Sequence, residues 1–159
     1  MSTLSSQTLC WSPSIEKMKG YTMIHSTPTL ETYLSLRKAT GLTPKNSQAA
    51  STGLANTLFA VQTSPSSSPD TVVGRGRMIG DGGCFFQLVD MAVHPEHQRK
   101  GVGKMIMKEL KEWMDKNVPE TGTVLLFADG KANELYKQYG FVETSTTSPF
   151  FSKGMALRY

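Results

Sequence analysis

A long apolar strand that leads, through a turn with two glycines, into a long amphipathic helix is the clearest pattern in this chain. The strand covers Cys84–Val93, and the helix begins around Gly101 and Gly103. Apolar side chains recur along the helix every three or four residues, at Val102, Ile106, Leu110 and Trp113. A helix with such a stripe packs on the sheet that holds the apolar strand, so we expect a layered fold of helices and strands.

The remaining patterns predict an α/β fold, more closely an α+β mixed sheet with helices on both faces. The expected order is β-α-α-β-β-β-α-β-α-β-β. Strands are predicted at 21–25, 54–62, 72–79, 84–93, 123–128, from 141 onward and, as a final hairpin, within 144–159. Helices are predicted at 29–40, at 47–52, from the glycine turn to Pro119, and at 131–139. The three strands between 54 and 93 should be antiparallel neighbours.

Length and composition are those of one globular domain. The 159 residues fit a single domain, and an apolar content of 38 % excludes a disordered chain or a fibre. No apolar run approaches the roughly 18 residues of a membrane-spanning helix. Residues 1–20 are rich in Ser and Thr, so we expect a flexible or surface-docked extension there and a single domain over 21–159.

The cysteines and the amino-terminal region bear on the cell compartment. Cys10 and Cys84 form neither a disulfide framework nor the spacing of a zinc site, so an intracellular protein without a metal site is expected. The first arginine is Arg37, whereas mitochondrial transit peptides are usually rich in arginine. The cytoplasm is therefore the predicted location, and an organelle remains an alternative.

The start of the long helix has the features of an anion-binding site. The backbone N–H groups from Lys100 to Lys104 lie at a helix N-terminus, where they lack intrahelical acceptors. Gly101 and Gly103 carry no side chain that would keep a phosphate from the backbone. Four cations, Arg99, Lys100, Lys104 and Lys108, follow without an intervening acid. These features favour a ligand with several phosphates.

Other interpretations of this segment compete with an anion-binding site. The glycines and charges alone fit an ordinary turn and a solvated helix face equally well. Ile106 stands where a dinucleotide fingerprint has its third glycine, and the chain has no Gly-x-x-x-x-Gly-Lys-Ser/Thr motif. A nucleic-acid surface over 99–116 is less favoured, because acids interrupt the basic run and no aromatic platform accompanies it.

Two motifs carry a resemblance to a known family. The turn Gln98-Arg-Lys-Gly-Val-Gly103, preceded by the strand end Met91-Ala-Val-His-Pro95, resembles the Gln/Arg-x-x-Gly-x-Gly/Ala signature of the GCN5-related N-acetyltransferase (GNAT) superfamily. Leu135-Tyr-Lys-Gln-Tyr-Gly-Phe141 resembles the second signature of that family. The resemblance covers 21–159 and suggests a small stand-alone acetyltransferase. Family members often carry a cofactor-contacting Asn where this chain has Asp129, and Asn133 is a candidate substitute.

The resemblance implies a GNAT-like acyl-CoA N-acyltransferase fold, acetyl-CoA as the donor and CoA as a product. By carry-over, the amides of 100–104 would hold the pyrophosphate and the backbone of Met91 and Val93 would pair with the pantetheine arm. The Met91 N–H would polarise the thioester carbonyl. The full set of implied cofactor-binding residues is Met91, Ala92, Val93, Gln98, Arg99, Lys100, Gly101, Val102, Gly103, Lys104, Asn133 and Tyr136.

Tyr136 is, by the same resemblance, the acid that protonates the departing thiolate. The general base is left open among Asp90, which lies inside an apolar strand, Asp81 in the Gly80–Gly83 turn, Glu31, and a water molecule relayed by backbone groups. His94 and His97 are interpreted as structural or surface residues. Cys84 is interpreted as a small core residue.

The acceptor pocket is expected between the first two helices and the final hairpin. Candidate substrate-binding residues are Glu31, Tyr33, Phe85, Phe150 and Phe151. Aromatic walls suit a small alkyl- or arylalkylamine that attacks directly in a ternary complex. The alternatives are a protein N-terminal or lysine acetyltransferase and an inactive CoA-binding module. We expect a small-molecule amine as partner, no nucleic acid or membrane partner, and a monomer or homodimer.

Overall fold

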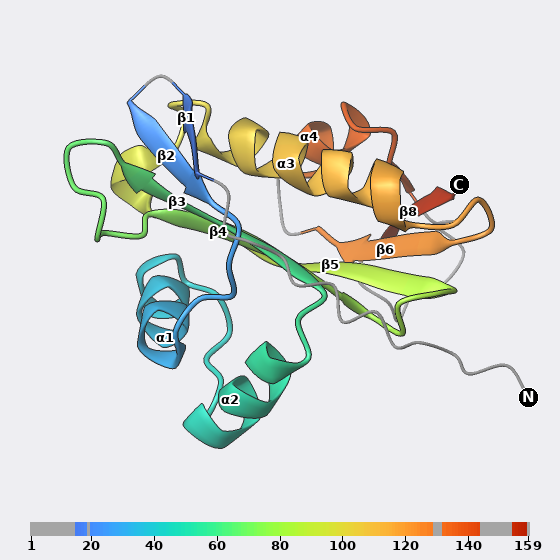
Figure 1. The fold of residues 1–159 in the computed structure, drawn as a ribbon, viewed down its shortest axis with the longest axis horizontal. Helices are drawn as coiled ribbons and strands as arrows, with labels where there is room; N and C mark the ends of the chain where they lie inside the picture. Colours follow the sequence, from blue (N-terminus) through green and yellow to red (C-terminus); the bar gives the residue numbers. More distant parts are fainter. Residues whose placement is uncertain (1–14, 19, 129–131, 144–153, 159) are drawn as a thin grey trace, which may run out of the picture.

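The centre of the molecule is a mixed sheet with helices on both faces (Figure 1). The computed structural model describes residues 15–18, 20–128, 132–143 and 154–158. The strand order across the sheet is β1-β2-β3-β4-β5-β6-β8-β7. The strands are β1 (Ile15–Met18), β2 (Tyr21–Ile24), β3 (Phe59–Pro65), β4 (Gly74–Gly80), β5 (Phe85–Val93), β6 (Thr123–Phe127), β7 (Val142–Glu143) and β8 (Gly154–Arg158). Strands β5 and β6 are parallel, and the other neighbouring strands are antiparallel.

Helices cover both faces of this sheet (Figure 1). Helices α1 (Leu30–Ala39) and α2 (Ser47–Ala55) lie on one face, and α3 (Val102–Asn117) and α4 (Asn133–Lys137) lie on the other. A 3-10 turn, η1 (Pro95–His97), connects β5 to α3. Side-chain caps begin the first two helices: Thr29 Oγ1 accepts from the Thr32 N–H at 3.2 Å, and Asn46 Oδ1 accepts from the Ala49 N–H at 2.7 Å. The described residues include no helix with the length and apolar character needed to span a bilayer.

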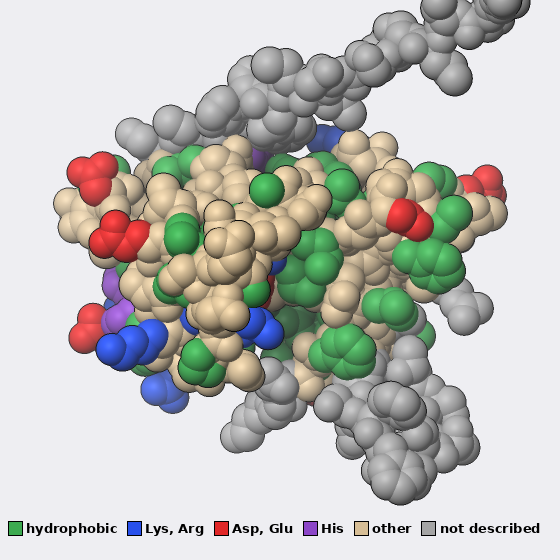
Figure 2. All heavy atoms as spheres, turned by 90° about the horizontal axis from the view of Figure 1, so that it is seen from below, with side chains coloured by type: hydrophobic (Ala, Val, Ile, Leu, Met, Phe, Trp, Pro, Cys, Tyr) green, Lys and Arg blue, Asp and Glu red, His purple; other side chains and the backbone are tan. Residues whose placement is uncertain are grey.

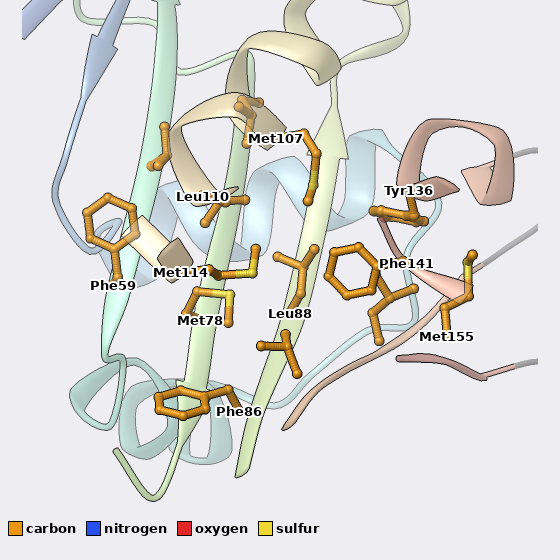
Figure 3. Packing of buried hydrophobic residues seen from close by; sticks show 14 of the residues in the cluster. Phe59, Met78, Phe86, Leu88, Met107, Leu110, Met114, Tyr136, Phe141 and Met155 are labelled. Carbon is orange, nitrogen blue, oxygen red and sulfur yellow. The ribbon is translucent and has the colours of Figure 1, made fainter. Parts of the chain in front are cut away.

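The main core lies between α3 and the sheet (Figure 3). Helix α3 buries its apolar stripe, and Ile106, Leu110 and Met114 are fully buried. Two glycines of β4 allow this helix to approach closely: a Cβ at Gly74 would lie 2.9 Å from Ile106 Cδ1, and one at Gly76 would lie 2.7 Å from Leu110 Cδ1. The close packing fixes where the N-terminus of α3 lies relative to the end of β5.

The predicted α/β class, the mixed sheet and its helices on both faces are confirmed, and the strands β3, β4 and β5 are antiparallel neighbours as expected. The predicted strand 54–62 starts too early. Leu54 lies in α2, where it is buried against Tyr33 and Ala50 in a small second core, and β3 begins only at Phe59. Burial of Leu54 on the helix outweighs the strand-like pattern of the residues that follow.

Towards the amino terminus, Ile15–Met18 form β1, which pairs with β2. At the other end, β8 pairs with both β6 and β7, whereas most of the predicted hairpin segment, 144–153, lies outside the described residues.

Candidate active site

A cavity of about 720 Å³ opens where β5 and β6 separate. Its walls come from α1 and the loop after it, from β4, β5 and the end of β6, and from α4. Figure 2 views the molecule from the side that carries α1 and α2, where Lys or Arg side chains lie beside hydrophobic ones near the centre. Elements from both faces of the sheet, α1 on one and α4 on the other, thus line the cavity.

The separation of β5 from β6 begins at a bulge in β5. The two strands pair in parallel from Phe85 with Thr123 to Leu88 with Leu126, and within the described residues β5 then continues along β4 alone. Arg75 on β4 pairs with Ala92 on β5, and Arg77 pairs with Val89. Between these two pairs β4 advances by two residues, whereas β5 advances by three. The extra residue bends and twists the strand. Asp90 in this bulge has a φ of 57°, in the left-handed region that Asp tolerates better than most residues.

The bulge leaves backbone groups of β5 available for a ligand. Beyond Leu88, the edge of β5 that faces β6 has no ladder partner in the part of the chain that the structure describes. Edge groups of this kind can pair with an extended ligand as an added strand would. The two parallel strands thus part beyond the pair of Leu88 and Leu126.

The turn that follows β5 presents the amides of the first turn of α3. Gly101 caps this helix in a left-handed conformation, with a φ of 87°. The Met105 N–H donates to the Gly101 carbonyl at 3.0 Å, which is the first hydrogen bond of the helix. The amides of Val102 to Lys104 come before it and therefore have no intrahelical acceptor. The first turn of α3 contains no acid. Gln98 Nε2 donates to the Val93 carbonyl at 3.0 Å and ties this turn to the end of β5.

Gly103 faces the region between β5 and α4. A Cβ at this position would lie 3.7 Å from Leu135 Cδ2 and 3.9 Å from Val93 Cγ2, which are ordinary contacts. Packing within the described residues therefore does not itself demand a glycine. The missing side chain keeps the first turn of α3 accessible, as an anion site requires.

Helix α4 lies against the first turn of α3 and contributes a tyrosine to the cavity. Tyr136 is 6 % exposed, lines the cavity, and packs edge-to-face on Phe141 at 6.1 Å between ring centroids (Figure 3). The Tyr139 hydroxyl donates to the Lys104 carbonyl at 2.9 Å, and burial raises the pKa of Tyr139. Asn133 Oδ1 is buried without a hydrogen-bond partner among the described residues.

Asp90 is the centre of a buried ion-pair cluster. Its Oδ1 accepts from Arg37 Nη1 and, at 3.3 Å, from the Tyr33 hydroxyl. Its Oδ2 accepts from Arg77 Nε at 2.9 Å and lies 2.9 Å from Arg77 Nη2. The three charged side chains are each less than a tenth exposed. Both oxygens of this candidate base are thus engaged by arginines.

The arginines of this cluster connect α1 and β4 to neighbouring segments. Arg37 on α1 donates to the Thr43 carbonyl at 2.8 Å from Nε, and Arg77 on β4 donates to Thr57 Oγ1 at 2.6 Å. Arg75 is fully buried, donates to the Tyr33 carbonyl at 2.7 Å, and stacks over the Tyr33 ring at 4.3 Å. Burial lowers the pKa of Arg75 to about 10, and the nearby Asp90 charge opposes this shift. Arg75 remains a cation at neutral pH.

Other predicted residues lie elsewhere. Asp81 accepts backbone hydrogen bonds from Gly83, Cys84 and Phe85 at 2.8 to 3.1 Å, which lower the pKa of its carboxyl, and it does not line the cavity. Phe85 is 61 % exposed and Glu31 is exposed; neither lines the cavity, whereas Tyr33 does. The predicted Phe150 and Phe151 lie outside the described residues.

Sequence reasoning missed several lining residues, among them Arg37, Leu42, Lys45, Arg77 and Phe127. One signal was available for the arginines. A carboxylate inside an apolar strand needs a buried cation as partner, and the neighbouring strand carries arginines at alternate positions. The loop residues gave no comparable signal, because their place depends on how α1 docks.

Comparison with known proteins identifies the family. A family model described as an acetyltransferase (GNAT) domain matches residues 55–143, more than half of the chain. The chain belongs to the GNAT acetyltransferase family. The resemblance seen in the two sequence motifs is thereby confirmed.

Curated relatives of this GNAT chain include two proteins named ycf52. It is 31 % identical over 84 residues to the uncharacterized N-acetyltransferase ycf52 of Gracilaria tenuistipitata var. liui, a match that covers 53 % of this chain and 43 % of that protein. A second ycf52 protein, from Porphyra purpurea, is 30 % identical over 76 residues, covering 48 % and 42 %. The matched part thus spans less than half the length of these curated relatives.

Solved structures of GNAT proteins share the fold. A protein of unknown function from methicillin-resistant Staphylococcus aureus, SA2161, described as a probable acetyltransferase, has a TM-score of 0.75 at 35 % identity; the match covers 87 % of this chain and 99 % of that one. The ribosomal-protein-S18-alanine N-acetyltransferase of Escherichia coli has a TM-score of 0.65 at 17 % identity, covering 85 % and 92 %, and shows likeness of fold alone.

The Asp90 cluster gives a prediction about stability. Asp90→Asn keeps the size of the side chain and its tolerance of positive φ but leaves two buried arginines without their counter-ion. Breaking a buried pair costs about 3–5 kcal/mol, which corresponds to a fall in Tm of roughly 6–20 °C for a chain of this length. Thermal unfolding followed by circular dichroism measures the shift.

Asp115→Asn is the matched control, because Asp115 pairs with Lys111 on the surface of α3. Its expected cost is below about 1 kcal/mol. Unchanged stability of Asp90→Asn would contradict a structural role for the cluster. Loss of activity at unchanged stability would instead favour Asp90 as the base.

Proposed function

We propose that this protein transfers the acetyl group of acetyl-CoA to a primary amine of a small molecule, by direct attack of the amine in a ternary complex. The observation that carries the proposal is the opening between β5 and β6 directly beside the accessible first turn of α3. An extended ligand with phosphates at one end matches this arrangement. GNAT acetyltransferases use acetyl-CoA as donor, and the chain belongs to that family.

The residues present fit acetyl-CoA. The amides of Val102, Gly103 and Lys104 would hold the pyrophosphate, with Arg99 and Lys100 supplying positive charge. The edge of β5 from Val89 to Val93 would pair with the amides of the pantetheine arm. The buried Asn133 Oδ1, which has no partner among the described residues, would accept a hydrogen bond from the ligand.

The chemistry needs one donor at the carbonyl oxygen and one at the sulfur. Acetyl-CoA supplies an activated acyl group when bound. In our proposal the Met91 N–H, released by the bulge, donates to the carbonyl oxygen as negative charge develops there. The Tyr136 hydroxyl gives its proton to the departing sulfur. The amine nitrogen forms the new amide bond and loses a proton.

Water is the acceptor of that proton in this proposal. Asp90 keeps its two arginines, and Asp81 lies outside the cavity lining. Among the described lining residues, Asp90 is the one with a carboxylate. A cytoplasmic location and a monomeric or dimeric state remain predictions.

The anion site predicts the effect of a bulky residue at Gly103. Gly103→Val should fold, because the first added atom meets only ordinary contacts, but its branches would cover the amides of the first turn. Loss of one such charge-assisted bond is worth about 1.5–3 kcal/mol, so the Kd for acetyl-CoA should rise roughly 10- to 150-fold. Isothermal titration calorimetry measures the Kd.

Gly53→Val is the control, because an added Cβ on α2 meets no atom within 4 Å. Its affinity for acetyl-CoA should equal that of the unchanged protein. If a folded Gly103→Val variant also binds acetyl-CoA with unchanged Kd, the cofactor lies elsewhere.

Tyr136→Phe tests the acid. The ring that packs on Phe141 is kept while the proton donor is lost, so folding and acetyl-CoA affinity should persist. General acid catalysis contributes about 10² to 10⁴-fold, which is the expected fall in kcat. The measurement is thiol release at saturating substrates, with single-turnover rates if product release limits kcat. A fall smaller than about threefold in the chemical step would reject Tyr136 as the acid.

A further inference from the structure

The charges that line the cavity are unbalanced. Among the described residues, the charged side chains of the lining are Arg37, Lys45, Arg77 and Asp90. Arg75 lies directly behind them, fully buried against Tyr33. The described lining and Arg75 behind it thus hold four cations and one carboxylate, and this carboxylate is already paired with two of them. Among the described residues, a net positive charge remains at this end of the cavity.

The cofactor does not account for this excess. The phosphates of acetyl-CoA would lie at the N-terminus of α3, beside Arg99, Lys100 and Lys104. Arg37 and Lys45 belong to α1 and the loop after it, on the opposite face of the sheet (Figure 1). The pantetheine arm and the thioester that would fill the gap between the strands carry no charge. The positive charge is thus placed where the acceptor would enter.

We infer that the acceptor is an amine that also carries a carboxylate, an amino acid in the general sense, with its carboxylate facing Lys45. This inference rests on the proposed acetyl transfer. Lys45 is exposed and has no ion-pair partner among the described residues, so its charge is available to a substrate. Arg37 and Arg77 would add to the attraction for the substrate carboxylate while they remain paired with Asp90. Simple diamines and polyamines, which carry only positive charge, would be repelled.

The same charges bear on how the amine loses its proton. Neighbouring cations disfavour an ammonium group and so lower its pKa, which raises the fraction of neutral, nucleophilic amine. A site of this kind needs no carboxylate base within reach of the amine. The residues that line the cavity are consistent with this, because the one carboxylate among the described lining residues is already paired with arginines. The inference therefore refines the alkyl- or arylalkylamine class to members that bear a carboxylate.

Matched pairs of acceptors test the inference. Thiol release from acetyl-CoA is measured with phenylalanine against 2-phenylethylamine, leucine against 3-methylbutylamine, and 4-aminobutanoate against butylamine. Methyl esters of the amino acids serve as a third arm, since they keep the size and remove the charge. We expect kcat/KM to be at least about tenfold higher for the carboxylate in one or more sets. Equal or lower values in every set would overturn the inference.

Lys45→Gln separates a specific contact from a general preference. We expect KM for the favoured amino acid to rise about two- to fivefold, as for an exposed charge pair, with no such rise for the matching plain amine, which has no carboxylate to lose a partner. Lys38→Gln is the control, because Lys38 is exposed on α1 and does not line the cavity. An equal effect on both acceptors, or none on either, would overturn the role of Lys45.

The design distinguishes failure of the inference from failure of the proposed function. If plain amines are acetylated and carboxylate-bearing amines are not preferred, the inference is wrong and the proposed function stands. Thermal stabilisation by acetyl-CoA without thiol release from any acceptor also overturns the inference and leaves cofactor binding in place. Absence of both stabilisation and thiol release contradicts the proposed function itself.

Discussion

Asp90 holds together the parts of the molecule on which the site depends. Its backbone adopts a left-handed conformation inside β5, and its carboxylate binds arginines from α1 and β4. Burying a carboxylate is costly unless cations and hydrogen bonds satisfy it, and here both oxygens are engaged. The ion pairs therefore stabilise the bulge, and the bulge turns β5 away from β6. Without the bulge, we expect the two parallel strands to pair further and to close the opening between them.

The second requirement is the position of α3. Its buried stripe packs closely over the glycines of β4, so its first turn lies fixed beside the end of β5. An opening between two strands and a row of accessible amides are each common features of proteins. It is their position side by side that is characteristic of this site. Together they match an extended ligand with phosphates at one end. The proposed acceptor side is built separately, from α1, its following loop and the cationic cluster on the other face of the sheet.

Local patterns were sufficient to predict most of the fold. The apolar period of α3, the glycine turn and the runs of β4 and β5 are short-range features that the sequence shows directly. Leu54 was misassigned because its burial depends on Tyr33, which is distant in sequence. The elements that we propose to hold the cofactor, the end of β5 and the first turn of α3, were predictable from contiguous motifs. Arg37, Lys45 and Phe127, in contrast, come together only through the docking of α1 and the strand order.

The account's central claim is that the slot beside the Asp90 bulge and the first turn of α3 form one acetyl-CoA site. Hydrogen–deuterium exchange with and without acetyl-CoA tests this most directly. The account predicts slower exchange on binding for the amides of Met91 and Val93 and for those of Val102 to Lys104, with little change in α2. Binding without protection of these amides, or with protection confined to another region, would contradict it.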